Sequence, residues 1–120
     1  MATILVVEDT PGNLALATKL LRAAGHEVLA TDTGATGVAM ARDRLPDLVL
    51  MDLGLPDMDG WQALREIRSD HRAAQLRVVA FTADAMLGDR ERALSEGFDG
   101  YMSKPINFAT FAESVEGYLR

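Results

Sequence analysis

The sequence predicts an α/β domain in which helices cover both faces of a parallel sheet. Short apolar runs alternate about five times with segments of helical period, and uninterrupted apolar runs are typical of strands buried on both faces. The chain has 120 residues, 48% of them hydrophobic, which is enough for one buried core. We therefore expect one compact domain over residues 1–120 and no separate output domain.

The first half of the expected fold contains three strands and two helices. Aliphatic and β-branched runs predict strands near 3–8, 27–31 and 47–52. The first helix is expected to have Thr10 as its N-cap and Pro11 in its first turn, and to be closed by Gly25. Its apolar stripe comprises Leu14, Ala17, Leu20, Leu21 and Ala24. A second helix is expected over 34–44, ending before Pro46, with an apolar face formed by Val38, Ala41 and Leu45.

The second half contains three more helices and two more strands, the latter near 77–82 and 100–103. The third helix is predicted over 61–68, with an apolar stripe of Trp61, Leu64 and Ile67. Arg90 to Glu96 followed by Gly97 indicates a fourth helix, whose start is weakened by Gly88. The last helix is expected from Asn107, with a buried stripe of Phe108, Phe111, Val115 and Leu119.

Charge and composition exclude several classes of partner. The formal net charge is −6 and the 12 basic residues are scattered, which argues against binding to a nucleic-acid backbone. Without cysteine there is no disulfide framework and no thiolate metal site. No charged leader precedes the first strand, and no apolar stretch approaches the ~20 residues of a membrane span. We expect a cytoplasmic protein, away from membranes, whose partners are proteins or cations.

Polar side chains follow four of the expected strands: Glu8-Asp9, Asp52, Thr82 and Lys104. In open α/β sheets, ligands bind beyond the carboxyl ends of the strands. Three acids at one edge would repel one another, which predicts raised pKa values, unless a cation such as Mg²⁺ joins them. One carboxylate can attack phosphorus, while Lys104 and the Thr82 hydroxyl interact with the phosphoryl oxygens. The set therefore indicates phosphoryl chemistry with a divalent metal.

These residues resemble a known family, the receiver domains of two-component response regulators, including the stand-alone chemotaxis-type regulators. The resemblance covers the whole chain and rests on four motifs in order: Val6-Val7-Glu8-Asp9, Leu50-Met51-Asp52 through Asp59-Gly60, Thr82-Ala83-Asp84-Ala85, and Lys104-Pro105. It implies a doubly wound, five-stranded parallel sheet with the flavodoxin-like strand order 2-1-3-4-5. It also implies a phosphorylatable switch in a two-component or phosphorelay system, not an enzyme that turns over small molecules.

The resemblance implies a role for each site residue. Asp52 is the expected phosphoacceptor, and the expected Mg²⁺ ligands are Glu8, Asp9, Asp52 and the carbonyl of Gly54. Thr82 and Tyr101 are the expected switch residues, Lys104 the phosphate-binding amine, and Pro105 the residue after a cis peptide bond. Gly54 and Asp84 are the expected positions that set the lifetime of the aspartyl phosphate.

The resemblance also implies partners. The phosphoryl donor is expected to be a sensor histidine kinase or a histidine phosphotransfer protein. A downstream protein is expected to bind the face formed by the fourth helix, the fifth strand and the fifth helix, and a phosphorylation-dependent homodimer stays open. The cognate kinase, the target, and the choice between a binding switch and a relay are not encoded in any motif.

Each residue also has an ordinary interpretation. Asp9 and Thr82 are suitable helix caps, and Lys104 alone is a common surface lysine. The segment from Leu55 to Gly60 lacks the spaced acids and distal Glu of a calcium loop, so it is interpreted as a turn that caps the third helix. His26 and His71 have no second ligand at metal spacing and are expected at the surface.

Three other functions stay open. An aspartyl-phosphate phosphatase of the haloacid-dehalogenase type needs a second acid two residues after the nucleophile, where this chain has Gly54. A flavodoxin-like cofactor carrier needs a loop after the first strand that accepts an anionic phosphate, and Glu8-Asp9 opposes this. A receiver-like interaction module that is never phosphorylated has the same fold, although the complete acid set disfavours it.

Overall fold

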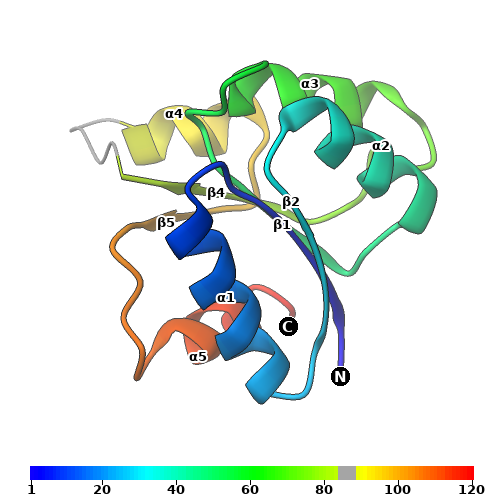
Figure 1. The fold of residues 1–120 in the computed structure, drawn as a ribbon. Helices are drawn as coiled ribbons and strands as arrows, with labels where there is room; N and C mark the ends of the chain where they lie inside the picture. Colours follow the sequence, from blue (N-terminus) through cyan, green and yellow to red (C-terminus); the bar gives the residue numbers. More distant parts are fainter. Residues whose placement is uncertain (84–88) are drawn as a thin grey trace.

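The computed structural model describes residues 1–83 and 89–120, and in this part of the chain five parallel strands alternate with five helices (Figure 1). The elements are β1 (Thr3–Val7), α1 (Pro11–Ala23), β2 (Glu27–Thr31), α2 (Gly34–Arg44), β3 (Leu48–Met51), α3 (Gly60–Ser69), β4 (Val78–Thr82), α4 (Asp89–Glu96), β5 (Gly100–Ser103) and α5 (Phe111–Gly117). The predicted α/β class is confirmed. Asp84, an expected lifetime-setting position, and Gly88, expected to weaken the start of the fourth helix, lie outside the described residues.

The strand order is β2-β1-β3-β4-β5, with every neighbouring pair parallel, as the resemblance implied. The register determines which of the polar residues that follow the strands lie side by side. Because Val7 pairs with Met51, Glu8 and Asp52 leave β1 and β3 side by side. Because Thr82 pairs with Ser103, Lys104 leaves β5 next to the end of β4.

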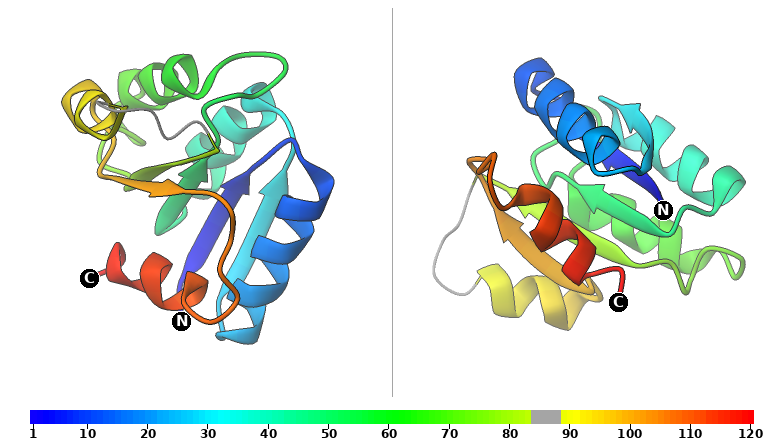
Figure 2. Two further views of the ribbon diagram at one scale, coloured as in Figure 1. Left: turned by 90° about the vertical axis from the view of Figure 1, so that its left-hand side faces the viewer. Right: turned by 90° about the horizontal axis from the view of Figure 1, so that it is seen from below.

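Alternate residues of the strands pack on opposite faces of the sheet. One cluster joins Leu5, Val49 and Ala80 to buried residues of α2, α3 and α4. The other joins Ile4, Leu50 and Phe81 to buried residues of α1 and α5. Figure 2 shows the resulting three layers from two sides. Since both faces are covered, the central strands are apolar without alternation, as the sequence indicated.

Local interactions explain where the helices begin and end. Pro11 occupies the first turn of α1, although the Thr10 side chain makes no capping hydrogen bond. Thr33 and Asp59 cap α2 and α3 by accepting hydrogen bonds from the N–H groups of Thr36 and Gln62. Gly97 follows α4 with a φ of 114°, a conformation in which glycine has no steric penalty.

The predictions for the last helix and for the end of α2 were partly wrong. Helix α5 begins at Phe111, because the Asn107 side chain and carbonyl accept bonds from Ala109, Thr110 and Phe111 N–H groups and form a separate turn. Phe108 lies in this turn and is 71% exposed. Leu45 follows α2 in the left-handed region and is 47% exposed, so it is not part of the apolar face.

His26 was expected at the surface but is buried between the N-terminus and α5. Its Nδ1 accepts a hydrogen bond from the N–H of Ala2 at 3.1 Å, and its Nε2 lies 3.3 Å from a carboxylate oxygen of Glu116. His71 is exposed, as expected. Among the described residues, no helix has both the length and the apolar character required to cross a membrane.

Candidate functional site

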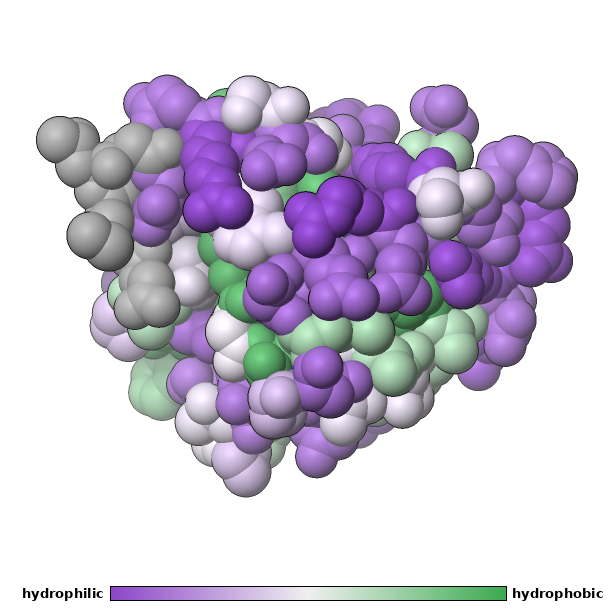
Figure 3. Space-filling model, turned by 90° about the horizontal axis from the view of Figure 1, so that it is seen from above, coloured by the Kyte–Doolittle hydropathy of each residue, from purple (hydrophilic) through white to green (hydrophobic). Residues whose placement is uncertain are grey.

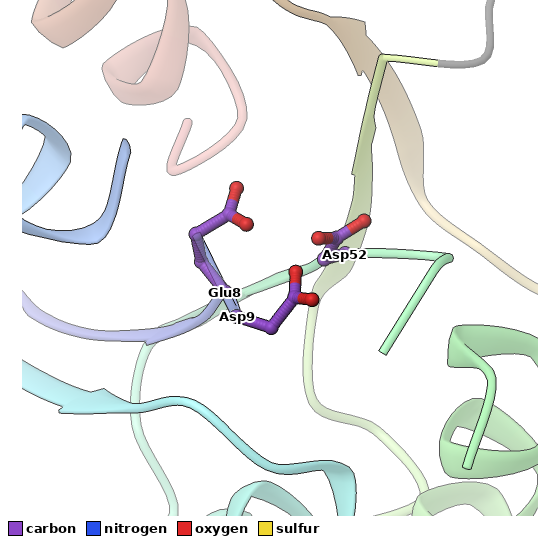
Figure 4. Close-up of side chains that lie close together, drawn as sticks. All are labelled: Glu8, Asp9 and Asp52. Carbon is purple, nitrogen blue, oxygen red and sulfur yellow. The ribbon is translucent and has the colours of Figure 1, made fainter. Parts of the chain in front are cut away.

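Three carboxylates meet at the carboxyl ends of β1 and β3 (Figure 4). Glu8 and Asp9 directly follow β1, and Asp52 directly follows β3. One oxygen of each side chain lies within 4.8 Å of the other two. The parallel register produces this arrangement, since Asp52 N–H donates to the carbonyl of Val7 at 3.0 Å and fixes the two strand ends together.

The three acids differ in burial and in hydrogen bonding. Glu8 is completely buried and Asp52 is 5% exposed, while Asp9 is more open to solvent. Glu8 Oε2 accepts a bond from the N–H of Thr10, and Asp52 Oδ1 accepts one from the N–H of Gly54, both at 3.0 Å. Each buried carboxylate is therefore held in place by its own following loop.

Lys104 reaches the two buried acids from the end of β5. Its Nζ forms ion pairs with Glu8 Oε1 and, at 3.2 Å, with Asp52 Oδ2. The amine also lies 5.1 Å from the centroid of the Phe81 ring, and the side chain is only 8% exposed. Lys104 N–H donates to the carbonyl of Thr82, and the peptide bond that joins Lys104 to Pro105 is cis. The lysine is thus a fixed part of the site.

The pKa values of the two buried acids are shifted in opposite directions. Burial raises the pKa of Glu8 above its ordinary value, and the neighbouring Lys104 offsets this only in part. Burial alone would also raise the pKa of Asp52, but the hydrogen bond from the Gly54 N–H, with the neighbouring Glu8 carboxyl and the Lys104 amine, holds that pKa below its ordinary value. The expectation of raised values was therefore wrong for Asp52, because it considered repulsion among the acids without the Gly54 N–H and the lysine.

The donor set fits Mg²⁺. The ion prefers hard oxygen ligands, keeps several of its waters, and is usually held by one or two carboxylates. Here two buried carboxylates and a more exposed one lie close together, and Lys104 is the cation among the described residues that contacts the buried pair. The cluster therefore keeps a net negative charge that a metal ion can neutralise. Asp9 and Asp52, with Glu8 behind them, are the residues that would hold the ion, directly or through water.

The other predicted residues lie around this cluster. Thr82 is buried at the end of β4, and Thr82 and Gly54 line the same surface hollow, together with residues of α3 and α4. Tyr101 lies within β5 opposite Ala80 and is partly buried against the core of the α2, α3 and α4 face. The structure thus brings Glu8, Asp9, Asp52 and Lys104 into contact and places Thr82 beside them.

Sequence reasoning missed one residue of the loop after β3. The Asp57 carboxylate accepts hydrogen bonds from the N–H groups of Gly34 and Ala35, at the start of α2. Asp59 of the same loop caps α3, as the turn interpretation predicted. No local pattern identifies the contact of Asp57, because its partners lie 23 and 22 residues away in the chain.

Three comparisons with known proteins agree with this geometry. Residues 4–116 match the family described as response regulator receiver domain. The polar-differentiation response regulator DivK of Brucella ovis is 37% identical over 117 residues, which cover 98% of this chain and 95% of DivK. A CheY-like receiver domain protein from Methanospirillum hungatei JF-1 is 28% identical and superposes with a TM-score of 0.88, covering 99% of this chain and 94% of that chain.

A third similar protein contains a metal. The receiver domain of the sensor histidine kinase PA1611 from Pseudomonas aeruginosa PAO1 has a magnesium ion coordinated in its active site cleft. It is 35% identical and superposes with a TM-score of 0.88, covering 98% of this chain and 97% of that chain.

Proposed function

The chain belongs to the response regulator receiver domains, the phosphoacceptor domains of two-component signalling, and on this premise we propose that Asp52 receives the phosphoryl group. The observation that carries the proposal is the contact of Asp52 with the buried amine of Lys104, next to two further acids. A nucleophilic carboxylate must be ionised. The pKa of Asp52 is lowered whereas that of Glu8 is raised, which favours Asp52 as the nucleophile.

Each side chain of the cluster has a task in the transfer. A carboxylate oxygen of Asp52 forms a bond to phosphorus as the bond from phosphorus to the donor histidine nitrogen breaks. Lys104 and the Thr82 hydroxyl interact with the phosphoryl oxygens, and Glu8, Asp9, Asp52 and the carbonyl of Gly54 hold Mg²⁺. The metal, when bound, supplies positive charge that offsets the charge of the phosphoryl group.

The transferred group then acts as a signal. Thr82 lies at the end of β4 and Tyr101 on the neighbouring β5, so movement of the hydroxyl toward the phosphoryl group is passed to the surface formed by α4, β5 and α5. This surface binds the downstream protein, or a second copy of the chain. Gly54 and Asp84 set the lifetime of the phosphoryl group by controlling the access of water.

The proposed donor is a phosphohistidine on a sensor histidine kinase or on a histidine phosphotransfer protein. The reaction takes place in the cytoplasm, where the ATP used by such kinases is available. We propose that the chain passes on the signal through contacts with other proteins.

The test is phosphorylation by acetyl phosphate, followed by intact mass. With Mg²⁺ the wild-type mass is expected to rise by one phosphoryl group, with no gain in EDTA or in Asp52→Asn. Asp47→Asn is a matched control, because Asp47 precedes β3 whereas Asp52 follows it. An unchanged wild-type mass at saturating donor and Mg²⁺ overturns the proposal, and a label on Asp9 moves the nucleophile.

A further inference from the structure

The loop between β3 and α3, residues 52–59, is tied to an element that plays no part in the proposed transfer. Asp57 Oδ1 lies 2.8 Å from the backbone nitrogen of Gly34, and Oδ2 lies 2.9 Å from that of Ala35. These two N–H groups belong to the first turn of α2, where no intrahelical partner exists. One carboxylate thus caps a helix that it does not precede in the chain.

Packing reinforces this tie. A Cβ atom at Gly34 would lie 2.4 Å from Cγ of Met58, so any other residue type at this position would have to displace the Met58 side chain. The hydrogen bonds of Asp57 hold its pKa below the ordinary value, because its anionic form accepts two backbone N–H groups. The contact therefore has both a charge and a shape requirement.

The same loop contains the metal site at its other end. Asp52 Oδ1 accepts the bond from the Gly54 N–H, and the Gly60 N–H donates to the carbonyl of Leu53 at 3.0 Å. These bonds hold residues 52–54 and the start of α3. The middle of the loop contains Asp57. Among the described residues, the long-range hydrogen bonds of this middle part are the two that join Asp57 to the start of α2.

We propose that Asp57 is a positioning residue for Mg²⁺ binding: by capping α2 it keeps the Gly54 end of the loop ordered beside Asp52 before the metal arrives. The inference rests on the proposed function, which makes the carbonyl of Gly54 a ligand. A ligand that is already ordered loses less conformational freedom when the ion binds. Coupling between two sites is reciprocal, so Mg²⁺ also tightens the start of α2.

Three variants disturb the contact by different routes. Asp57→Ala removes both acceptor oxygens, whereas Asp57→Asn removes the charge and keeps one oxygen. Gly34→Ala leaves the Asp57 charge in place and displaces Met58. Asp47→Asn is the matched acidic control, because Asp47 Oδ2 accepts the N–H of Thr3 at the opposite end of β3. Gly12→Ala in α1 is the glycine control, since nothing lies within 4 Å of its Cβ position.

The experiment measures the Mg²⁺ dissociation constant by calorimetry and the hydrogen exchange of the Gly34 and Ala35 amides with and without Mg²⁺. Asp57→Ala and Gly34→Ala are each expected to weaken Mg²⁺ binding about tenfold, with Asp57→Asn in between and both controls at the wild-type value. In the wild type, Mg²⁺ is expected to slow exchange of both amides, and this effect is lost in Asp57→Ala. A purely structural cap would lower the melting temperature without changing either measurement.

The outcomes separate this inference from the proposed function. If the wild type itself binds no Mg²⁺, the proposed function fails. If the wild type binds Mg²⁺ and Asp57→Ala and Gly34→Ala bind it equally well, only the positioning role of Asp57 is overturned. If Asp57→Asn is as weak as Asp57→Ala while Gly34→Ala matches the wild type, the effect is one of charge and the inference is wrong. Should Asp57→Ala fail to fold, Gly34→Ala and Asp57→Asn decide alone.

Discussion

At the amino end of the sheet, Arg68 and Arg77 donate mainly to backbone carbonyls, whereas at the carboxyl end two buried acids share one lysine. Arg68 donates to the carbonyls of Ala74, Leu76 and Gly97, and Arg77 donates to those of Tyr118 and Arg120. Glu8 and Asp52, at the other end, share the single amine of Lys104. The arginines of the amino end therefore stabilise the fold, whereas the carboxyl end keeps negative charge that a bound cation can neutralise.

Figure 3 views the molecule from the side on which α2, α3 and α4 lie in Figure 1, and this side is mainly hydrophilic, with hydrophobic residues in smaller areas between polar ones. Arg92 of α4 lies 4.1 Å from the ring centroid of Trp61 in α3, so a cation covers part of this partly buried aromatic side chain.

The largest expected effect comes from removing the shared amine. In Lys104→Met, Glu8 and Asp52 face each other without a cation, and loss of one partner of a buried pair costs roughly 3 kcal/mol of unfolding free energy near neutral pH. The pKa of Glu8 is already raised in the folded state, and the loss of the cation raises it further. Stability of the variant in EDTA is thus expected to fall as pH rises through this pKa.

Urea unfolding of Lys104→Met in EDTA and in Mg²⁺ measures this effect. Mg²⁺ is expected to restore part of the lost stability, since the ion replaces the missing positive charge. Lys19→Met is the control, because Lys19 is an exposed lysine of α1. Equal losses for Lys104→Met and Lys19→Met would show that the carboxyl end does not depend on its cation.

The second prediction concerns the buried acid itself. Glu8→Gln removes a charge that is costly to bury, so in EDTA we expect this variant to melt above the wild type at neutral pH. In the wild type the folded-state pKa of Glu8 is raised, so the wild type in EDTA loses stability as pH rises through that pKa. Glu8→Gln has no carboxyl group at this position and does not show this loss. Mg²⁺ at about 100 times its dissociation constant stabilises the wild type by about 2.7 kcal/mol, and Glu8→Gln gains less.

Thermal melts in EDTA and in Mg²⁺ at several pH values test this prediction. Glu113→Gln is the control, because Glu113 is an exposed acid of α5. If Glu8→Gln melts below the wild type in EDTA and gains as much from Mg²⁺, Glu8 belongs to the structural scaffold and not to the metal site.

The sequence predicted the elements of both ends because they depend on local patterns. Buried strands are apolar throughout, and the parallel register then brings the residues after them together, so Glu8, Asp9, Asp52 and Lys104 were identified correctly as neighbours. What failed depends on contacts between distant segments. His26 is buried by the N-terminus and α5, and Asp52 lies against a lysine 52 residues away, which adds to the effect of the Gly54 N–H on its pKa.

Two local errors have a different cause. The helical period continues from Phe108 through Val115, but the Asn107 side chain accepts a hydrogen bond from the Ala109 N–H and forms a separate turn before α5 begins. Leu45 has the right spacing for the stripe of α2, but it adopts the left-handed conformation that ends the helix. Periodicity locates an apolar face well and its last residue poorly, because caps compete with helix hydrogen bonds at the ends.

The third prediction moves to the amino end. Arg68 makes four contacts that join the ends of α3 and α4 to the start of β4, including one to Asp99 at 2.9 Å. Arg68→Ala is expected to cost about 2 kcal/mol in unfolding free energy, because several carbonyls lose a charged donor. Phosphorylation and the Mg²⁺ dissociation constant are expected to stay at the wild-type values.

Arg68→Lys sharpens this prediction, since lysine keeps the charge but not the planar set of donors. It is expected to recover less than half of the loss, as measured by urea unfolding. A change in the phosphorylation rate of either variant would mean that the two ends of the sheet are coupled. The amino end would then affect function as well as stability.

The smallest expected effect concerns two backbone positions near the amino end. Gly25 and Leu45 both have positive φ, 93° and 46°, and follow α1 and α2 respectively. An L-residue in the left-handed region costs roughly 1 kcal/mol, so Gly25→Ala should lower stability by about that amount. Leu45→Gly should raise it by less, because glycine also loses more conformational freedom on folding and the half-exposed leucine side chain is lost.

Both changes are measured by urea unfolding, with phosphorylation unchanged because neither residue approaches the acid cluster. If Leu45→Gly destabilises the protein by more than about 1 kcal/mol, the Leu45 side chain contributes packing that outweighs its backbone strain, and the amino end relies on apolar contacts as well as on its hydrogen bonds.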